Sequence, residues 1–106
     1  MSYRLLVSVL AKADIRGIRD YFINQLFNPD AADDLIDKIK WKVSFLVDTP
    51  RMHQECNGDD GEPLDLRCFA VANYVVFYAV RDVDSTVEIQ RVLYRGRAVR
   101  RGLFNR

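Results

Sequence analysis

The sequence predicts a single α+β domain in which a helical hairpin packs on an antiparallel sheet. Three observations support this class. Apolar residues recur at helical spacing over positions 11–46, three strand-like segments follow in residues 65–94, and the 106 residues suit one domain spanning positions 1–106. The predicted element order is β-α-α-β-β-β, and three consecutive strands with short turns favour an antiparallel meander that the helices cover on one face.

Residues 3–9 are expected to form a short opening strand. The apolar spacing then changes to steps of three and four, which is typical of one helix face. This face comprises Ala11, Ile15, Ile18, Phe22 and Leu26. Asn28 is expected to cap a second helix, with Pro29 at its first position and Pro50 at its end. The core residues expected of that helix are Ala32, Leu35, Ile36, Ile39, Val43 and Leu46.

Residues 51–64 form the longest polar stretch and are expected to be a loop. Three strands are predicted after it, at Asp65–Val71, Tyr74–Val80 and Thr86–Tyr94. Ala72-Asn73 is expected to form the first turn between them, because Asn tolerates positive φ. The middle strand carries no charge, which is typical of a central strand that is covered on both faces.

The composition is that of an ordinary globular protein, with 49% hydrophobic and 29% charged residues. The sequence has no apolar run long enough for a membrane span, and its N-terminus does not read as a secretory signal. Two cysteines, Cys56 and Cys68, are too few for a disulfide scaffold and favour a reducing cytoplasm. Cys68 is expected in the core, whereas Cys56 is expected to be a loop thiol without a role.

The net charge of +1 conceals a basic C-terminal end. Residues 89–106 contain no acid and six arginines, namely Arg91, Arg95, Arg97, Arg100, Arg101 and Arg106. This end is either a solvated terminus or a surface for an acidic partner, because arginine pairs well with carboxylate and phosphate. No helix-turn-helix, zinc or ribbon motif is visible, so sequence-specific nucleic-acid binding is not expected.

Trp41 lies opposite the apolar stripe of the second predicted helix, with Phe45 one turn later on the same side. Either another part of the chain covers this pair, or it is an exposed aromatic anchor for a partner or a second protomer. Arg67 is interpreted first as a structural arginine and second as a partner contact. His53 has no neighbouring triad residue, and neither cysteine is spaced with it as a metal ligand, so no metal or cofactor is expected.

Four segments together resemble the RelE/ParE superfamily of bacterial type II toxins, and the ParE branch most. They are Ala13-Asp14-Ile15 with Ile18 and Tyr21, then residues 28–32, residues 67–78, and residues 87–94 followed by Arg97. The resemblance implies a small toxin made beside an antitoxin whose disordered tail wraps and neutralises it. ParE-type members poison DNA gyrase by stabilising its cleaved complex with DNA, whereas RelE-type members cut messenger RNA in the ribosome.

The residues favour the ParE alternative. RNA cleavage requires a base, an acid and fixed cations around the phosphate. Val75 stands where the RelE branch carries a strand arginine, residues 65–71 contain no lysine, and Leu103 and Phe104 replace a C-terminal tyrosine. Arg67, Arg97 and Tyr94 remain from which a weak ribonuclease site could be built.

The sequence therefore predicts a cytoplasmic, non-catalytic gyrase poison that is neutralised by a cognate antitoxin and forms a homodimer or a toxin–antitoxin hetero-oligomer. The alternatives are a ribosome-dependent ribonuclease and a decayed toxin that only binds its antitoxin. The residues expected to contact the target or the antitoxin are Arg97, Arg100, Arg101, Leu103, Phe104, Trp41 and Phe45.

Overall fold

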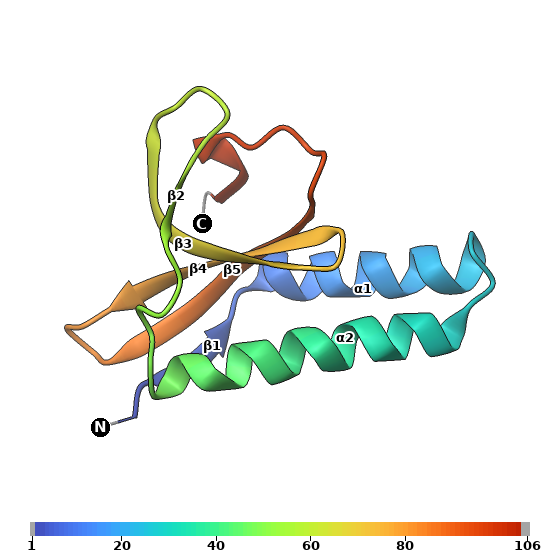
Figure 1. Ribbon diagram of the computed structural model, residues 1–106, viewed down its shortest axis with the longest axis horizontal. Helices are drawn as coiled ribbons and strands as arrows, with labels where there is room; N and C mark the ends of the chain where they lie inside the picture. The colour runs from blue at the N-terminus through green and yellow to red at the C-terminus, as the bar shows by residue number, and fades with distance from the viewer. Residues whose placement is uncertain (1, 105–106) are drawn as a thin grey trace.

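The computed structural model describes residues 2–104 of the chain. Two antiparallel helices lie side by side on one face of a twisted sheet, and the C-terminal segment returns over the other face (Figure 1). The elements are β1 (Arg4–Val7), α1 (Val9–Asn24), α2 (Pro29–Ser44), the 3₁₀ turn η1 (Phe45–Val47), β2 (Glu55–Asn57), β3 (Pro63–Val71), β4 (Tyr74–Arg81), β5 (Thr86–Tyr94) and the 3₁₀ turn η2 (Arg101–Phe104). None of these helices is long and apolar enough to cross a membrane.

The sheet confirms the predicted meander and adds to it. Its strand order is β1-β5-β4-β3-β2, with β3, β4 and β5 paired antiparallel. The opening strand β1 pairs parallel with β5, placing Arg4 opposite Thr86, so the sheet is mixed. A parallel pair needs a long connection, and here the chain passes through both helices and three strands between β1 and β5.

The second helix begins where its predicted cap, Asn28, places it. The first begins earlier than expected, because Ser8 and Val9 of the predicted strand 3–9 are the cap and the first residue of α1. The Ser8 hydroxyl accepts a hydrogen bond from the Ala11 backbone N–H at 3.0 Å, and the Asn28 side chain accepts one from the Ala31 N–H at 3.1 Å. The second helix is shorter than expected, because α2 ends at Ser44 and tightens into η1 well before Pro50. Its predicted core residues are all buried.

Two separate cores lie on the two faces of the sheet. The larger core holds the helices against the sheet and contains Ile18, Ile39, Leu46, Val76 and Tyr78 among others. The smaller core, on the opposite face, comprises Leu64, Leu66, Phe77, Leu93 and Phe104. Strand β4 contributes to both, as expected for an uncharged central strand.

The predicted loop at residues 51–64 is only partly a loop. Residues 55–57 form the edge strand β2, antiparallel to β3, and β3 itself begins at Pro63. The expectation of free cysteines is also wrong, since Cys56 of β2 and Cys68 of β3 form a disulfide with their Cα atoms 6.1 Å apart. The two residues lie 12 positions apart in a polar stretch, so only the pairing of β2 with β3 brings them together.

The turn between β3 and β4 forms where the sequence predicts it, but the residue with a positive φ is not the predicted one. Ala72, not Asn73, has the positive φ of 53°. A residue with a Cβ atom is disfavoured in this region by roughly 1–2 kcal/mol. The Asn73 carbonyl accepts a hydrogen bond from the Arg95 backbone N–H at 2.7 Å, which ties the turn to the end of β5.

Candidate functional site

The basic C-terminal segment, residues 95–104, folds back along the sheet face that the helices leave open. The Val99 backbone N–H donates a hydrogen bond to the Asp59 carboxylate at 2.9 Å, and the Val99 carbonyl accepts one from the Asp59 backbone N–H at 2.9 Å. Farther along, the Phe104 ring meets the Phe77 ring at 5.0 Å and completes the smaller core. The segment is thus part of the fold rather than a free tail.

The arginines and apolar residues predicted as contacts do not share one environment. Arg97, Arg100 and Arg101 are exposed, and Arg101 donates a hydrogen bond of 2.6 Å to the Pro63 carbonyl. Leu103 is half-buried and Phe104 is only 7% exposed. Most of the Phe104 side chain is therefore enclosed in the smaller core, and its remaining surface lines the cleft beside that core. Arg106 lies outside the described residues.

Arg91 does not belong to the basic end. Its guanidinium makes a two-pronged ion pair with Asp14 of α1, at 2.7 and 2.8 Å, and donates to the Leu103 carbonyl at 2.7 Å. Asp14 also accepts from the Val92 backbone N–H at 2.9 Å. The side-chain hydrogen bond to Asp14 raises the pKa of Arg91, which favours the charged form of the guanidinium. Sequence reasoning missed this pair, although both residues lie in the segments that carried the family resemblance.

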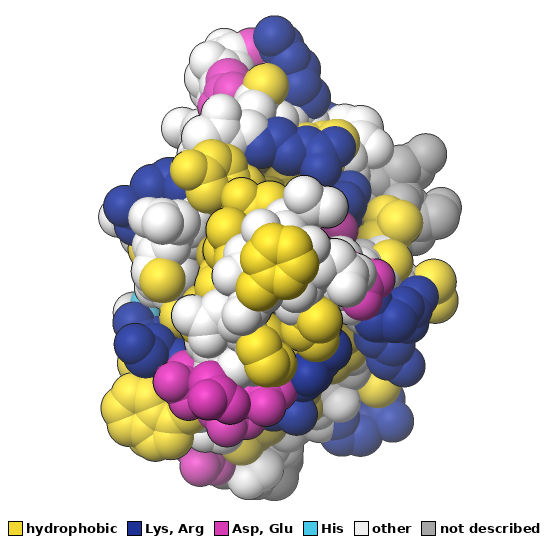
Figure 2. All heavy atoms as spheres, turned by 90° about the vertical axis from the view of Figure 1, so that its right-hand side faces the viewer, with side chains coloured by type: hydrophobic (Ala, Val, Ile, Leu, Met, Phe, Trp, Pro, Cys, Tyr) yellow, Lys and Arg dark blue, Asp and Glu magenta, His cyan; other side chains and the backbone are white. Residues whose placement is uncertain are grey.

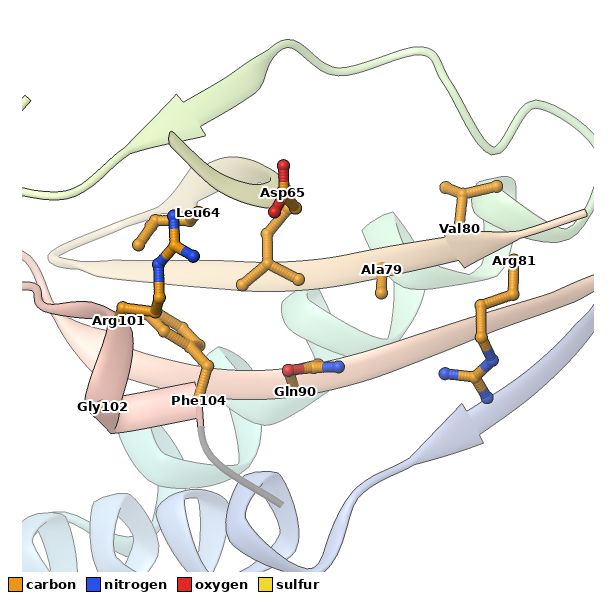
Figure 3. Close-up of a pocket in the computed structure, with 10 residues that line it drawn as sticks. Leu64, Asp65, Ala79, Val80, Arg81, Gln90, Arg101, Gly102 and Phe104 are labelled. Carbon is orange, nitrogen blue, oxygen red and sulfur yellow. The ribbon is translucent and has the colours of Figure 1, made fainter. Parts of the chain in front are cut away.

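A cleft of about 620 Å³ opens on the sheet face beside the folded C-terminal segment (Figure 3). Arg101 of η2 and Asp65 of β3 lie toward one end, and Arg81 of β4 lies toward the other. Arg81 is balanced by Glu88, whose carboxylate is 2.9 Å away. The described residues that line the cleft include no histidine, tyrosine, lysine or cysteine. Its side chains can therefore hold an anion or a peptide, but they offer only Asp65 for proton transfer.

Trp41 and Phe45 remain on the surface of α2 and η1. Their rings meet edge to face at 5.1 Å, and Trp41 is 62% exposed. No other described segment folds over them, so the covered alternative is wrong for this pair. An exposed tryptophan beside a second aromatic ring is the type of anchor that protein partners use.

Arg67 and His53 hold the segment after α2 against the sheet. The Arg67 guanidinium donates to the His53 carbonyl at 2.6 Å and lies 3.8 Å from the Glu55 carboxylate. The His53 ring stacks on Phe69 at 4.4 Å, and burial, assisted by Lys42, lowers its pKa. Burial likewise raises the pKa of Tyr78, whose hydroxyl donates to the Pro50 carbonyl at 2.8 Å. These contacts tie Arg67 to the segment after α2, and a contact between Arg67 and a partner stays a prediction.

A model of the ParE toxin of type II toxin–antitoxin systems, parDE, matches residues 5–99 of this sequence. The chain belongs to the ParE toxin family. Comparison with the curated proteins gives no match.

Two solved structures share the fold of this ParE-family toxin. One belongs to a chromosomal ParDE toxin–antitoxin system from P. aeruginosa, with a TM-score of 0.69, 19% identity, and coverage of 88% of this chain and 96% of that one. The other belongs to the RelBE2 toxin–antitoxin complex from Mycobacterium tuberculosis, with a TM-score of 0.60, 17% identity, and coverage of 90% and 100%. The RelE/ParE fold and the assignment to a type II toxin family are thereby confirmed.

Proposed function

We propose that this ParE-family toxin poisons DNA gyrase by binding and trapping its cleaved complex with DNA, without catalysing a reaction itself. The observation that carries the proposal is the chemistry of the open sheet face. Val75 packs with Phe77 and Leu93 in the smaller core, so apolar side chains occupy the strand surface where a ribonuclease needs cations. We also propose a cytoplasmic location, where gyrase acts.

Purified chain added to gyrase, ATP and supercoiled plasmid should yield linear DNA that is covalently linked to the enzyme after detergent treatment. Replacing Arg97 and Arg100 together with glutamate should reduce this product at least tenfold, because both guanidinium groups are exposed and have no ion pair within residues 2–104. Lys40→Glu, at an exposed position of α2, is the matched control and should leave the product unchanged. Absence of linear DNA with the wild-type chain would contradict the proposal.

A second candidate function, ribosome-dependent cleavage of messenger RNA, is favoured by one observation. Arg101 lies toward one end of the cleft, makes no ion pair among residues 2–104, and carries a guanidinium group that can bind a phosphate of RNA. Cut messenger on translating ribosomes, with gyrase unaffected, would favour this function. Normal growth on expression without an antitoxin would instead favour the decayed toxin.

We propose a cognate antitoxin as the neutralising partner, supported by membership of the ParE family and by the two similar structures, which come from toxin–antitoxin systems. We also propose that the chain forms a homodimer or a toxin–antitoxin hetero-oligomer. The antitoxin is expected to be encoded beside this chain.

Trp41→Ala is expected to weaken binding of that antitoxin at least tenfold, because truncating an aromatic hot spot typically removes about 2 kcal/mol of binding free energy or more, and about 1.4 kcal/mol corresponds to a factor of ten. Calorimetric titration measures this change. Stability should barely change, since Trp41 is mostly exposed. Unchanged affinity together with lowered stability would show that Trp41 serves the fold instead.

A further inference from the structure

The Cys56–Cys68 disulfide lies on the sheet face that carries the C-terminal segment, residues 95–104. Both cysteines are half-buried and pack against the smaller core, as does Val99 of that segment. The link joins β2 to β3 and closes a loop of residues 56–68, which we call the closed loop. In the cytoplasm, the location proposed above, a disulfide is usually transient and serves catalysis or redox sensing rather than permanent bracing.

The closed loop holds the C-terminal segment through its backbone. Asp59 accepts a hydrogen bond from the Val99 N–H and donates one to the Val99 carbonyl, both of 2.9 Å. The Pro63 carbonyl accepts a hydrogen bond of 2.6 Å from the Arg101 guanidinium. Gly58 marks how close the two backbones lie, because a Cβ atom there would be 3.1 Å from the Val99 carbonyl oxygen. These contacts together are the loop clamp.

Few contacts other than the disulfide hold β2 in place. The strand has three residues at the edge of the sheet, pairs with β3 alone, and shifts register between Cys56 and Asn57. Just before it, the Gln54 carbonyl accepts a hydrogen bond of 3.2 Å from the Cys68 N–H. Short edge elements with few buried contacts open at low free energy. Loss of the disulfide would therefore loosen the closed loop and with it the loop clamp.

The loop clamp lies between two anchors that do not involve the disulfide. The Arg95 backbone N–H donates to the Asn73 carbonyl at 2.7 Å, and the Phe104 ring packs against Phe77. Figure 2 shows Lys and Arg side chains in the upper part of the molecule, where Figure 1 places the C-terminal segment. Opening of the loop clamp would leave both anchors in place and free the arginines between them.

We infer that the Cys56–Cys68 disulfide is a redox switch for the basic segment. While the disulfide is closed, the loop clamp holds the arginines of residues 97–101 in one arrangement, and reduction releases them. The reductant is a dithiol: one thiolate attacks a cysteine sulfur and expels the other cysteine as a thiolate, and the second thiol then displaces the first cysteine. Two electrons and two protons pass to the cysteine pair, and the dithiol becomes a disulfide. Exchange with a disulfide oxidant reverses the step.

The oxidised chain should be the stronger poison of gyrase, because arginines that are already fixed lose less conformational freedom when they bind. This consequence rests on the function proposed above. The coupling between the disulfide and the C-terminal segment does not, and it can be measured on the purified chain alone.

The first experiment is limited digestion of the full chain with trypsin, with and without dithiothreitol, with cleavage sites located by mass spectrometry. Cleavage after Arg97 and Arg100 should be at least tenfold faster in the reduced chain. The trypsin concentration is kept low enough that neither form is cut after Arg16, an exposed residue of α1, so that the domain stays folded. Equal rates in the two forms, or faster cleavage only together with cleavage after Arg16, would overturn the switch.

Three variants test the path from the disulfide to the segment. The double variant Cys56→Ser with Cys68→Ser should be cut like the reduced wild type and should not respond to dithiothreitol. Asp59→Ala, which weakens the loop clamp but keeps the disulfide, should be cut rapidly even when oxidised. Asp37→Ala, at an exposed position of α2, is the matched control and should behave like the wild type.

The second experiment compares the oxidised wild type with the double serine variant in the gyrase assay, without reductant and at limiting toxin concentration. The oxidised wild type should yield at least threefold more linear DNA. Equal product from the two chains would overturn redox control of poisoning and leave gyrase poisoning itself intact. No product from either chain would overturn the proposed function, while the cleavage rates still decide whether the disulfide controls the segment.

Discussion

Replacing Arg91 with leucine is expected to lower the free energy of unfolding by about 3–5 kcal/mol, because it leaves a buried carboxylate without its partner. The side chains of Arg91 and Asp14 are only 11% and 12% exposed. Asp14 would keep a single hydrogen bond from the Val92 N–H, and the Leu103 carbonyl would lose its guanidinium donor. Urea unfolding at neutral pH measures the loss.

Two further variants test the physical reason. Arg51→Leu removes an ion pair with a single short contact, 2.6 Å from Asp82, in which both side chains are about half exposed, so it should change stability far less. Asp14→Leu combined with Arg91→Met removes both charges and should recover much of the lost stability. A small loss for Arg91→Leu alone would show that solvent reaches Asp14 and that the pair is not structural.

Reducing the Cys56–Cys68 disulfide is expected to lower the free energy of unfolding by about 3 kcal/mol, since the link restricts a short loop in the unfolded chain. The two cysteines are separated by 12 positions and join the edge strand β2 to β3. Unfolding curves recorded with and without a thiol reductant measure the difference. In a reducing cytoplasm the disulfide would be broken, and the protein would have the lower of the two free energies of unfolding.

The control for this prediction is the double variant Cys56→Ser with Cys68→Ser, whose unfolding should not respond to reductant. Titration of accessible thiols under denaturing conditions verifies that the starting protein is oxidised. Identical unfolding curves for oxidised and reduced wild type would show that the hydrogen bonds of residues 51–62, such as the 2.6 Å bond from Arg67 to His53, hold the segment without the link.

Replacing Arg91 with leucine is also expected to affect function, and not only the stability of the fold. Arg91 connects α1 and β5 to the carbonyl of Leu103, so it also positions the segment that carries Arg97, Arg100 and Arg101. Loss of gyrase poisoning in Arg91→Leu would therefore report on the fold of that segment. The surface variants Arg97→Glu and Arg100→Glu, which leave the ion pair intact, are needed to test contact with the target.

Much of the fold could be predicted because its signals are local. The helix faces follow from apolar spacing, and the start of α2 follows from Asn28 and Pro29. Strand β5 coincides with the predicted range Thr86–Tyr94. Strand β2 escaped prediction because it has only three residues, of which Glu55 and Asn57 are polar and exposed, and its pairing with β3 is what makes it a strand.

The candidate surfaces were predictable to different degrees. Trp41 and Phe45 could be placed on an outer face by helical geometry alone, and their exposure agrees with it. The groove of about 260 Å³ between α1 and the ends of β4 and β5 could not be foreseen, because its residues Tyr21, Tyr74 and Tyr94 come from three elements that meet only in the folded chain.

The sequence by itself determined the α+β class, the helical hairpin, the meander and the resemblance to the RelE/ParE toxins, because these depend on side-chain periodicity, capping residues and short motifs. Only the tertiary structure decided which arginines are free to meet a partner. Arg91 and Arg97 are equivalent in a list of basic residues, yet Arg91 is bound to Asp14, 77 positions away, whereas Arg97 faces solvent. An ion pair between such distant residues depends on how α1 packs against β5, which no local pattern encodes.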